Sequence, residues 1–76
     1  MAQKHLYATK KLKEIRQERE LRQDEMAFML DLLLERNVSH STYQKWEQGT
    51  LGIKLKDAIE IARWLKVSLK ELWRAK

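Results

Sequence analysis

The chain contains no proline, no cysteine and only two glycines among its 76 residues. A fold of many strands needs more turn-forming residues than this, so helices are the expected secondary structure. Without cysteine, neither a disulfide nor a thiolate metal site can stabilise the fold, and packed apolar side chains must form the core. Apolar residues make up 43% of the chain, which is enough for one all-α domain.

The small size restricts the function as well as the fold. A domain of this length buries only roughly 60% of the surface that its unfolded chain exposes, so we expect no enzyme, no cofactor and no small-molecule substrate. The longest apolar run is Met26 to Leu30, far short of the ~20 residues that cross a bilayer. No apolar signal segment follows Met1, and no His or acidic residues have metal-ligand spacing. We expect a cytoplasmic protein with no metal site and no membrane partner.

Charge is distributed unevenly along the chain, whose net charge is +5. Residues 1–20 have six cationic and three anionic side chains, residues 21–52 have three and five, and residues 53–76 have seven and three. The middle is therefore acidic, at −2, between flanks of +3 and +4. Such an excess of Lys and Arg can be an ordinary solvated surface, but it also suits a polyanion, with phosphate as the favoured group.

Apolar residues recur with helical spacing through most of the sequence. This pattern predicts helices over residues 10–20, from 23 to between 31 and 36, and over 40–48, 53–65 and 69–74. Ser39 suits the N-cap of the third helix, Gly49 suits its end, and Asn37 suits a left-handed turn before it. Residues 1–9 show no sustained period and are predicted to form an N-terminal arm.

Four groups of residues occur in a characteristic order. They are Leu12 with Arg16; Gln23 with Met26 and Ala27; Val38 and Ser39 with Ser41, Thr42, Tyr43, Trp46, Glu47 and Gly49; and Ile61 and Ala62 with Leu65, Val67, Ser68, Leu69, Glu71 and Leu72. With these residues the chain resembles the Cro/cI-type (XRE) helix-turn-helix family over about residues 10–73. The resemblance implies a compact five-helix lambda-repressor-like DNA-binding domain over residues 10–76, with the helix-turn-helix at about 23–48.

The third predicted helix has one apolar and one polar face. Tyr43 and Trp46 are three residues apart and are expected to point into the core with Val38. The side chains on the other face can bond base edges in the major groove. The resemblance implies that the base-contacting residues are His40, Ser41, Thr42, Gln44 and Lys45. It implies that the phosphate-contacting residues are Gln23, Gln48, Thr50, Lys54 and Lys56.

Arg16 and Glu47 are implied by the resemblance to form a structural ion pair between the first helix and the end of the third. The alternative is two unrelated surface charges. If the pair is partly buried, Arg16→Ala would leave Glu47 unpaired and would cost about 3 kcal/mol of stability.

The chain departs from the family pattern between Ala27 and Val38, where it is longer by more than one helical turn. An extended second helix or an extra turn before the recognition helix is therefore required. Phe28 and Leu32 are four residues apart on a face of their own. We expect this face to contact a second subunit, a protein partner or the N-terminal arm. Arg22 and Lys66 also replace residues that are better at helix ends.

The sequence and the resemblance thus predict a sequence-specific double-stranded DNA-binding transcriptional regulator, a repressor or dual regulator of prokaryotic or phage origin associated with the nucleoid. A homodimer would bind an inverted-repeat operator whose half-sites lie about 34 Å apart. One alternative is an antitoxin-like protein-interaction module that uses the apolar surface of the second helix, with DNA binding secondary. Another alternative is non-specific packaging of nucleic acid, driven by charge alone.

Overall fold

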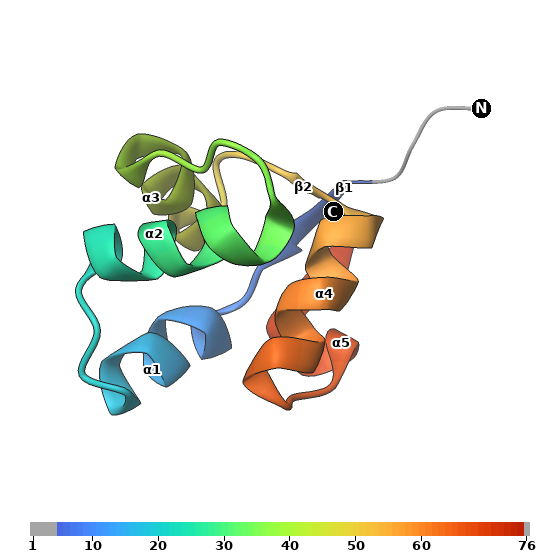
Figure 1. The fold of residues 1–76 in the computed structure, drawn as a ribbon. Helices are drawn as coiled ribbons and strands as arrows, with labels where there is room; N and C mark the ends of the chain where they lie inside the picture. Colours follow the sequence, from blue (N-terminus) through green and yellow to red (C-terminus); the bar gives the residue numbers. More distant parts are fainter. Residues whose placement is uncertain (1–4, 76) are drawn as a thin grey trace.

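Five helices form within residues 5–75, which are the residues that the computed structural model describes. They are α1 (Lys10–Glu18), α2 (Gln23–Leu34), α3 (His40–Gln48), α4 (Leu55–Leu65) and α5 (Leu69–Leu72). The helices α2 and α3 pack against each other, and α4 and α5 form the other half of the molecule (Figure 1). The all-α fold class expected from composition and periodicity is confirmed.

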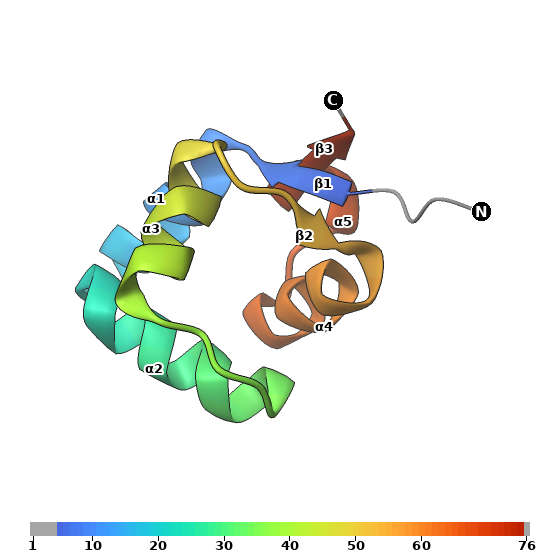
Figure 2. The ribbon, with the colours of Figure 1, turned by 90° about the horizontal axis from the view of Figure 1, so that it is seen from above.

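Three short strands accompany the helices, and the sequence analysis did not predict them. They are β1 (His5–Ala8), β2 (Ile53–Lys54) and β3 (Trp73–Ala75). The strand β1 is the central strand, antiparallel to both neighbours, with Leu6 opposite Ile53 on one side and Ala75 on the other. Figure 2 shows this small sheet at one edge of the molecule, beside α4 and α5.

The sheet corrects three boundaries. Residues 5–8 form a strand rather than an arm, whereas residues 1–4 lie outside the described part of the chain. Ile53 belongs to β2, so α4 begins at Leu55, and α5 ends at Leu72 because Trp73 is already extended. Strands of two to four residues have no periodicity of their own, since their hydrogen bonds come from partners far away in sequence.

The core lies between the two helical halves and under the sheet. Tyr43, Trp46 and Val38 are buried in it, as the apolar face of the third predicted helix indicated. The sheet contributes Ile53 and Trp73, and the indole Nε1 of Trp73 donates a hydrogen bond to the carbonyl oxygen of Ala58 at 3.1 Å. A polar atom carried into the core by a large aromatic side chain is thereby satisfied.

The extended second helix is followed by an ordered connection to α3. The left-handed residue that ends α2 is Glu35, with φ of 51°, and not Asn37, for which this conformation was expected. Asp31 Oδ1 accepts a hydrogen bond from the Val38 N–H at 2.7 Å. Arg36 Nη1 donates to Asp57 Oδ2 at 2.6 Å, which joins this connection to α4. The start of α3 is therefore held from both α2 and α4.

Candidate nucleic-acid interface

The polar face of α3 is presented to solvent because the opposite face is held in the core. Ser39 begins the helix, and its hydroxyl accepts from the Thr42 N–H at 3.0 Å. Gly49 ends it in the left-handed conformation, with φ of 77°. Between these ends Tyr43 and Trp46 are buried. The exposed side chains on the opposite side of the helix include His40, Ser41, Gln44 and Lys45.

Thr42 differs from the other four predicted base-contacting residues. It is half-buried, and its Oγ1 accepts a hydrogen bond from the Ser39 hydroxyl at 3.0 Å. Its hydroxyl therefore belongs to the cap of α3, whereas the four exposed side chains form one continuous polar face. We call this set, His40, Ser41, Gln44 and Lys45, the polar face of α3.

The predicted phosphate-contacting residues lie on both sides of α3 in the chain. Gln23 is the first residue of α2 and is half-buried. Gln48 is the last residue of α3, Thr50 and Lys54 lie between α3 and α4, and Lys56 is in the first turn of α4; all four are exposed. Thr50 packs back on the helix, since its Oγ1 donates to the Lys45 carbonyl oxygen at 3.3 Å.

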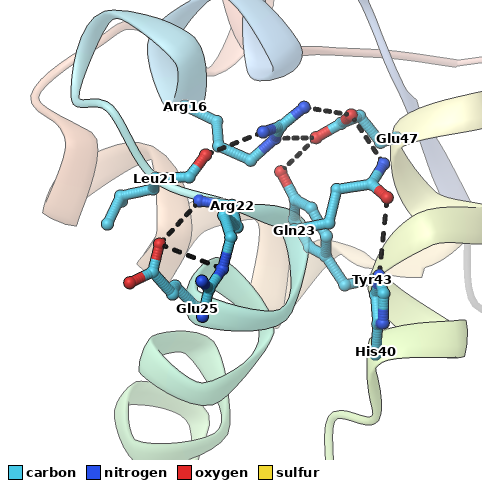
Figure 3. A network of polar contacts seen from close by, with 8 residues as sticks. All are labelled: Arg16, Leu21, Arg22, Gln23, Glu25, His40, Tyr43 and Glu47. Atoms are coloured by element: carbon cyan, nitrogen blue, oxygen red, sulfur yellow. Dashed lines mark hydrogen bonds and ion pairs between the residues drawn. The ribbon is translucent and has the colours of Figure 1, made fainter.

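A buried ion pair joins α1 to α3 (Figure 3). Arg16 Nε donates to Glu47 Oε2 at 2.8 Å, and Arg16 Nη2 donates to Oε1 at 3.1 Å. Only 10% of the Arg16 side chain and 4% of the Glu47 side chain are exposed. The third guanidinium nitrogen, Nη1, donates to the Leu21 carbonyl oxygen at 2.8 Å. The bidentate geometry fixes both side chains, and the pair predicted through the family resemblance is present.

Glu47 accepts two further hydrogen bonds inside this network. One comes from the Tyr43 hydroxyl at 2.5 Å and the other from Gln23 Nε2 at 3.1 Å. Burial alone would raise the pKa of the Glu47 carboxyl, but hydrogen bonds from Arg16, Tyr43 and Gln23 and the Arg16 charge outweigh it, so the pKa is lowered. Burial, and then the contact with Glu47, raise the pKa of the Tyr43 phenol. The carboxylate therefore stays ionised and the phenol stays protonated at neutral pH.

The link from Gln23 to Glu47 is a contact that the sequence patterns do not predict. The Gln23 side chain connects the first residue of α2 to the buried carboxylate, and its Oε1 lies 3.5 Å from His40 Nε2. No sequence signal indicates this contact, because a glutamine that begins a helix can equally point into solvent. The structure thus places a predicted phosphate contact and a predicted base contact side by side.

Phe28 and Leu32 lie on the outer surface of α2, where each is 63% exposed. The strand β1 is engaged by β2 and β3, so residues 5–8 do not cover this surface. Among the described residues, the N-terminal segment therefore does not cover Phe28 and Leu32. A second subunit or a protein partner remain as the predicted occupants.

The basic residues of α1 line an open cleft that the sequence analysis missed. The cleft has a volume of about 820 Å³, and its charged lining consists of Lys10, Lys11, Lys13 and Arg74 together with Glu14 and Glu47; Gln48 of α3 lies beside them. Within the part of the chain that the structure describes, none of these four cations forms a salt bridge. The charge sums located the basic excess in residues 1–20 and 53–76, but only the tertiary structure brings Arg74 of β3 and the lysines of α1 to one cleft.

Over residues 5–75, no group of three or more His, Asp or Glu side chains is arranged to hold a metal ion. None of the helices in this range is long and apolar enough to cross a membrane.

Comparison with known proteins agrees with this geometry. A family model described as helix-turn-helix matches residues 12–72, which include all of α2, α3 and α4 and most of α1. A search of curated proteins found no match to the chain.

Proposed function

Since the chain belongs to the Cro/cI-type (XRE) helix-turn-helix family of DNA-binding regulators, we propose that it is a sequence-specific repressor that reads duplex DNA with α3. The helix α3 would lie in the major groove, with its polar face toward the base edges. Occupancy of an operator would then block access of the polymerase to a promoter.

The exposed polar face of α3 is the observation that carries this proposal. Gln44 can pair with adenine through two hydrogen bonds, and Lys45 can donate to the acceptors of guanine. Ser41 and His40 can donate or accept. Burial of Tyr43 and Trp46 prevents α3 from rotating about its axis, so the same four side chains always face outward. Specific recognition requires this fixed presentation.

Affinity would come from contacts with the sugar–phosphate backbone. The Gln23 amide nitrogen has two N–H groups, of which one is donated to Glu47, so the other remains for a phosphate oxygen. Gln48, Thr50, Lys54 and Lys56 would contact the backbone on the other side of α3. Contacts of this kind fix the register of the protein but carry no sequence information.

Selection of bound duplexes from a random pool tests this proposal directly. We expect one enriched motif with two-fold symmetry and half-sites about 34 Å apart, as a homodimer requires. Lys45→Ala should relax the preference at one base pair in each half-site, whereas Lys70→Ala, at an exposed site on α5, should leave the motif unchanged. An affinity that is equal for selected and random duplexes would mean that charge alone drives binding, and it would overturn the proposal.

The exposed Phe28 and Leu32 favour a second candidate, in which the outer surface of α2 binds a protein partner in the manner of an antitoxin. The same surface could instead join the two subunits of a homodimer. Light scattering at high micromolar concentration separates these cases. A wild-type dimer that becomes a monomer in Leu32→Asp assigns the surface to the homodimer. A wild-type monomer excludes the homodimer, and a dimer that persists in Leu32→Asp uses another surface.

A further inference from the structure

The hydrogen-bond network behind α3 has a fixed direction. A carboxylate accepts hydrogen bonds and cannot donate them, so every partner of Glu47 must present a donor to it. Arg16 and Tyr43 do so, and the third partner is the Gln23 side chain, at 3.1 Å. Its amide must therefore turn its nitrogen toward Glu47, and its oxygen must turn the opposite way.

The oxygen of Gln23 points toward His40 (Figure 3), and Oε1 lies 3.5 Å from His40 Nε2. An amide oxygen can only accept, so Nε2 must carry the proton in this contact. A neutral imidazole has one donor nitrogen and one acceptor nitrogen. With the proton on Nε2, the acceptor of His40 is Nδ1.

We propose that His40 is a specificity-determining residue that presents a hydrogen-bond acceptor, its Nδ1, to the exocyclic amino group of an adenine or a cytosine in the major groove. Those amino groups are the donors that bases offer there, whereas N7 and O6 of guanine are acceptors. The inference deepens the proposed function and rests on it. Glu47 acts as the positioning residue, since it orients Gln23 and through Gln23 sets the tautomer of His40.

This assignment predicts an unusual sign for the effect of pH on DNA binding. Protonation of a histidine adds a positive charge, which by itself strengthens binding to a polyanion. For His40, however, protonation would turn the acceptor Nδ1 into a donor that faces another donor. Affinity is therefore expected to fall as the solution is acidified, opposite to the effect of charge alone.

The groups around His40 are neutral or held in ion pairs, so an effect of pH on DNA binding can be assigned to His40. Gln23, its neighbour on α2, is neutral, and Asp24 and Glu25 of the same turn lie within 4 Å of Arg22. Behind Gln23, Glu47 is held by Arg16 of α1, and its lowered pKa keeps it ionised well below neutral pH. The other charged side chain on the polar face is Lys45.

The experiment measures the dissociation constant for the selected operator between pH 8 and pH 5 at constant ionic strength. His5, the only other histidine, is replaced in all proteins by His5→Gln. In this background we expect affinity to fall about tenfold on acidification, a typical value for one base contact, and His40→Gln should remove the decrease. An affinity that is constant or rises toward pH 5 would overturn the proposal.

Two further measurements separate this inference from the proposed function. In the free protein, ¹⁵N NMR at pH 8 should place the His40 proton on Nε2, and a proton on Nδ1 would overturn the proposal without any DNA. In the complex, the base pair read by His40 is the one whose preference changes in His40→Ala, which removes the acceptor altogether. A base there that lacks only its exocyclic amino group should weaken wild-type binding but not binding of His40→Ala. Equal losses for both proteins would refute the acceptor role, whereas a selection without any motif would refute the proposed function itself.

Discussion

Glu47 links the stability of the fold to the position of Gln23, a residue predicted to contact DNA. Its carboxylate receives Arg16 from α1, Gln23 from α2 and Tyr43 from its own helix. Removal of any partner leaves a buried charge with fewer hydrogen bonds, which costs more than the net value of the contact. Substitutions at this site should therefore lower the free energy of unfolding directly and should affect DNA binding as a consequence.

Arg16→Ala is expected to lower the free energy of unfolding by about 3 kcal/mol, because it leaves the Glu47 carboxylate buried and unpaired. Urea denaturation measures this loss. Arg22→Ala is the matched control, since Arg22 pairs with Asp24 on the surface, where ion pairs contribute little. If Arg16→Ala abolished DNA binding at an unchanged melting temperature, Arg16 would be a DNA contact and not a structural residue.

The pH dependence of stability should also report Glu47. Its pKa is lower in the folded protein than its ordinary value of 4.5, so the unfolded chain binds the proton more readily. The stability from this group is present above about pH 4.5 and is lost as the pH falls through the folded pKa. Unfolding measured from pH 6 to pH 2 should show a smaller loss for Glu47→Gln than for the wild type. Parallel curves for the two proteins would contradict this expectation.

At the scale of elements, three helices are followed by residues that are not well suited to the left-handed backbone required there. Glu20, Glu35 and Lys66 have φ values of 55°, 51° and 60°, in the left-handed region that glycine adopts without strain. Glu35 and Lys66 are the C-caps of α2 and α4, and Glu20 follows the end of α1. The boundaries of these helices are therefore set by the packing of the next segment of the chain and not by a local stop signal.

Lys66→Gly should consequently stabilise the protein by about 1 kcal/mol, because it removes the steric cost of a left-handed side chain at the end of α4. The free energy of unfolding in urea measures the gain. Lys66→Ala is the matched control, since it removes the same charge and chain but keeps the Cβ atom. Equal stabilities of the two variants would show that the side chain, and not the backbone, limits this position.

At the scale of the whole molecule, a group of basic side chains lies beside α3 and not on it. The polar face of α3 carries one permanent charge, on Lys45, whereas Lys10, Lys11, Lys13 and Arg74 line the cleft next to Gln48. A DNA backbone that passes along this cleft would meet several cations without salt-bridge partners among the described residues. We therefore expect specificity and affinity to come from different parts of the surface.

The salt dependence of DNA binding tests this division. The triple variant Lys10→Gln, Lys13→Gln, Arg74→Gln should reduce the slope of log K against log[salt] by about 0.9 for each phosphate that it no longer neutralises, with the selected motif unchanged. The control Arg63→Gln, Lys66→Gln, Lys70→Gln removes the same charge at the exposed end of α4 and in α5, and it should alter the slope much less. Equal slopes for the two triple variants would show that only the net charge matters.

The periodic signals of the sequence determined the helices, the buried faces of α3 and α4, and the ends at Ser39 and Gly49, because each depends on residues within one or two turns. The Arg16–Glu47 pair could be predicted only through the family resemblance, since its members are 31 residues apart. The tertiary structure alone decided the three-stranded sheet, the cleft of α1 and Arg74, and the contact of Gln23 with Glu47 and His40. These features join short segments that are distant in the chain, and no local pattern records such contacts, because their hydrogen bonds and charges meet only after the helices have packed.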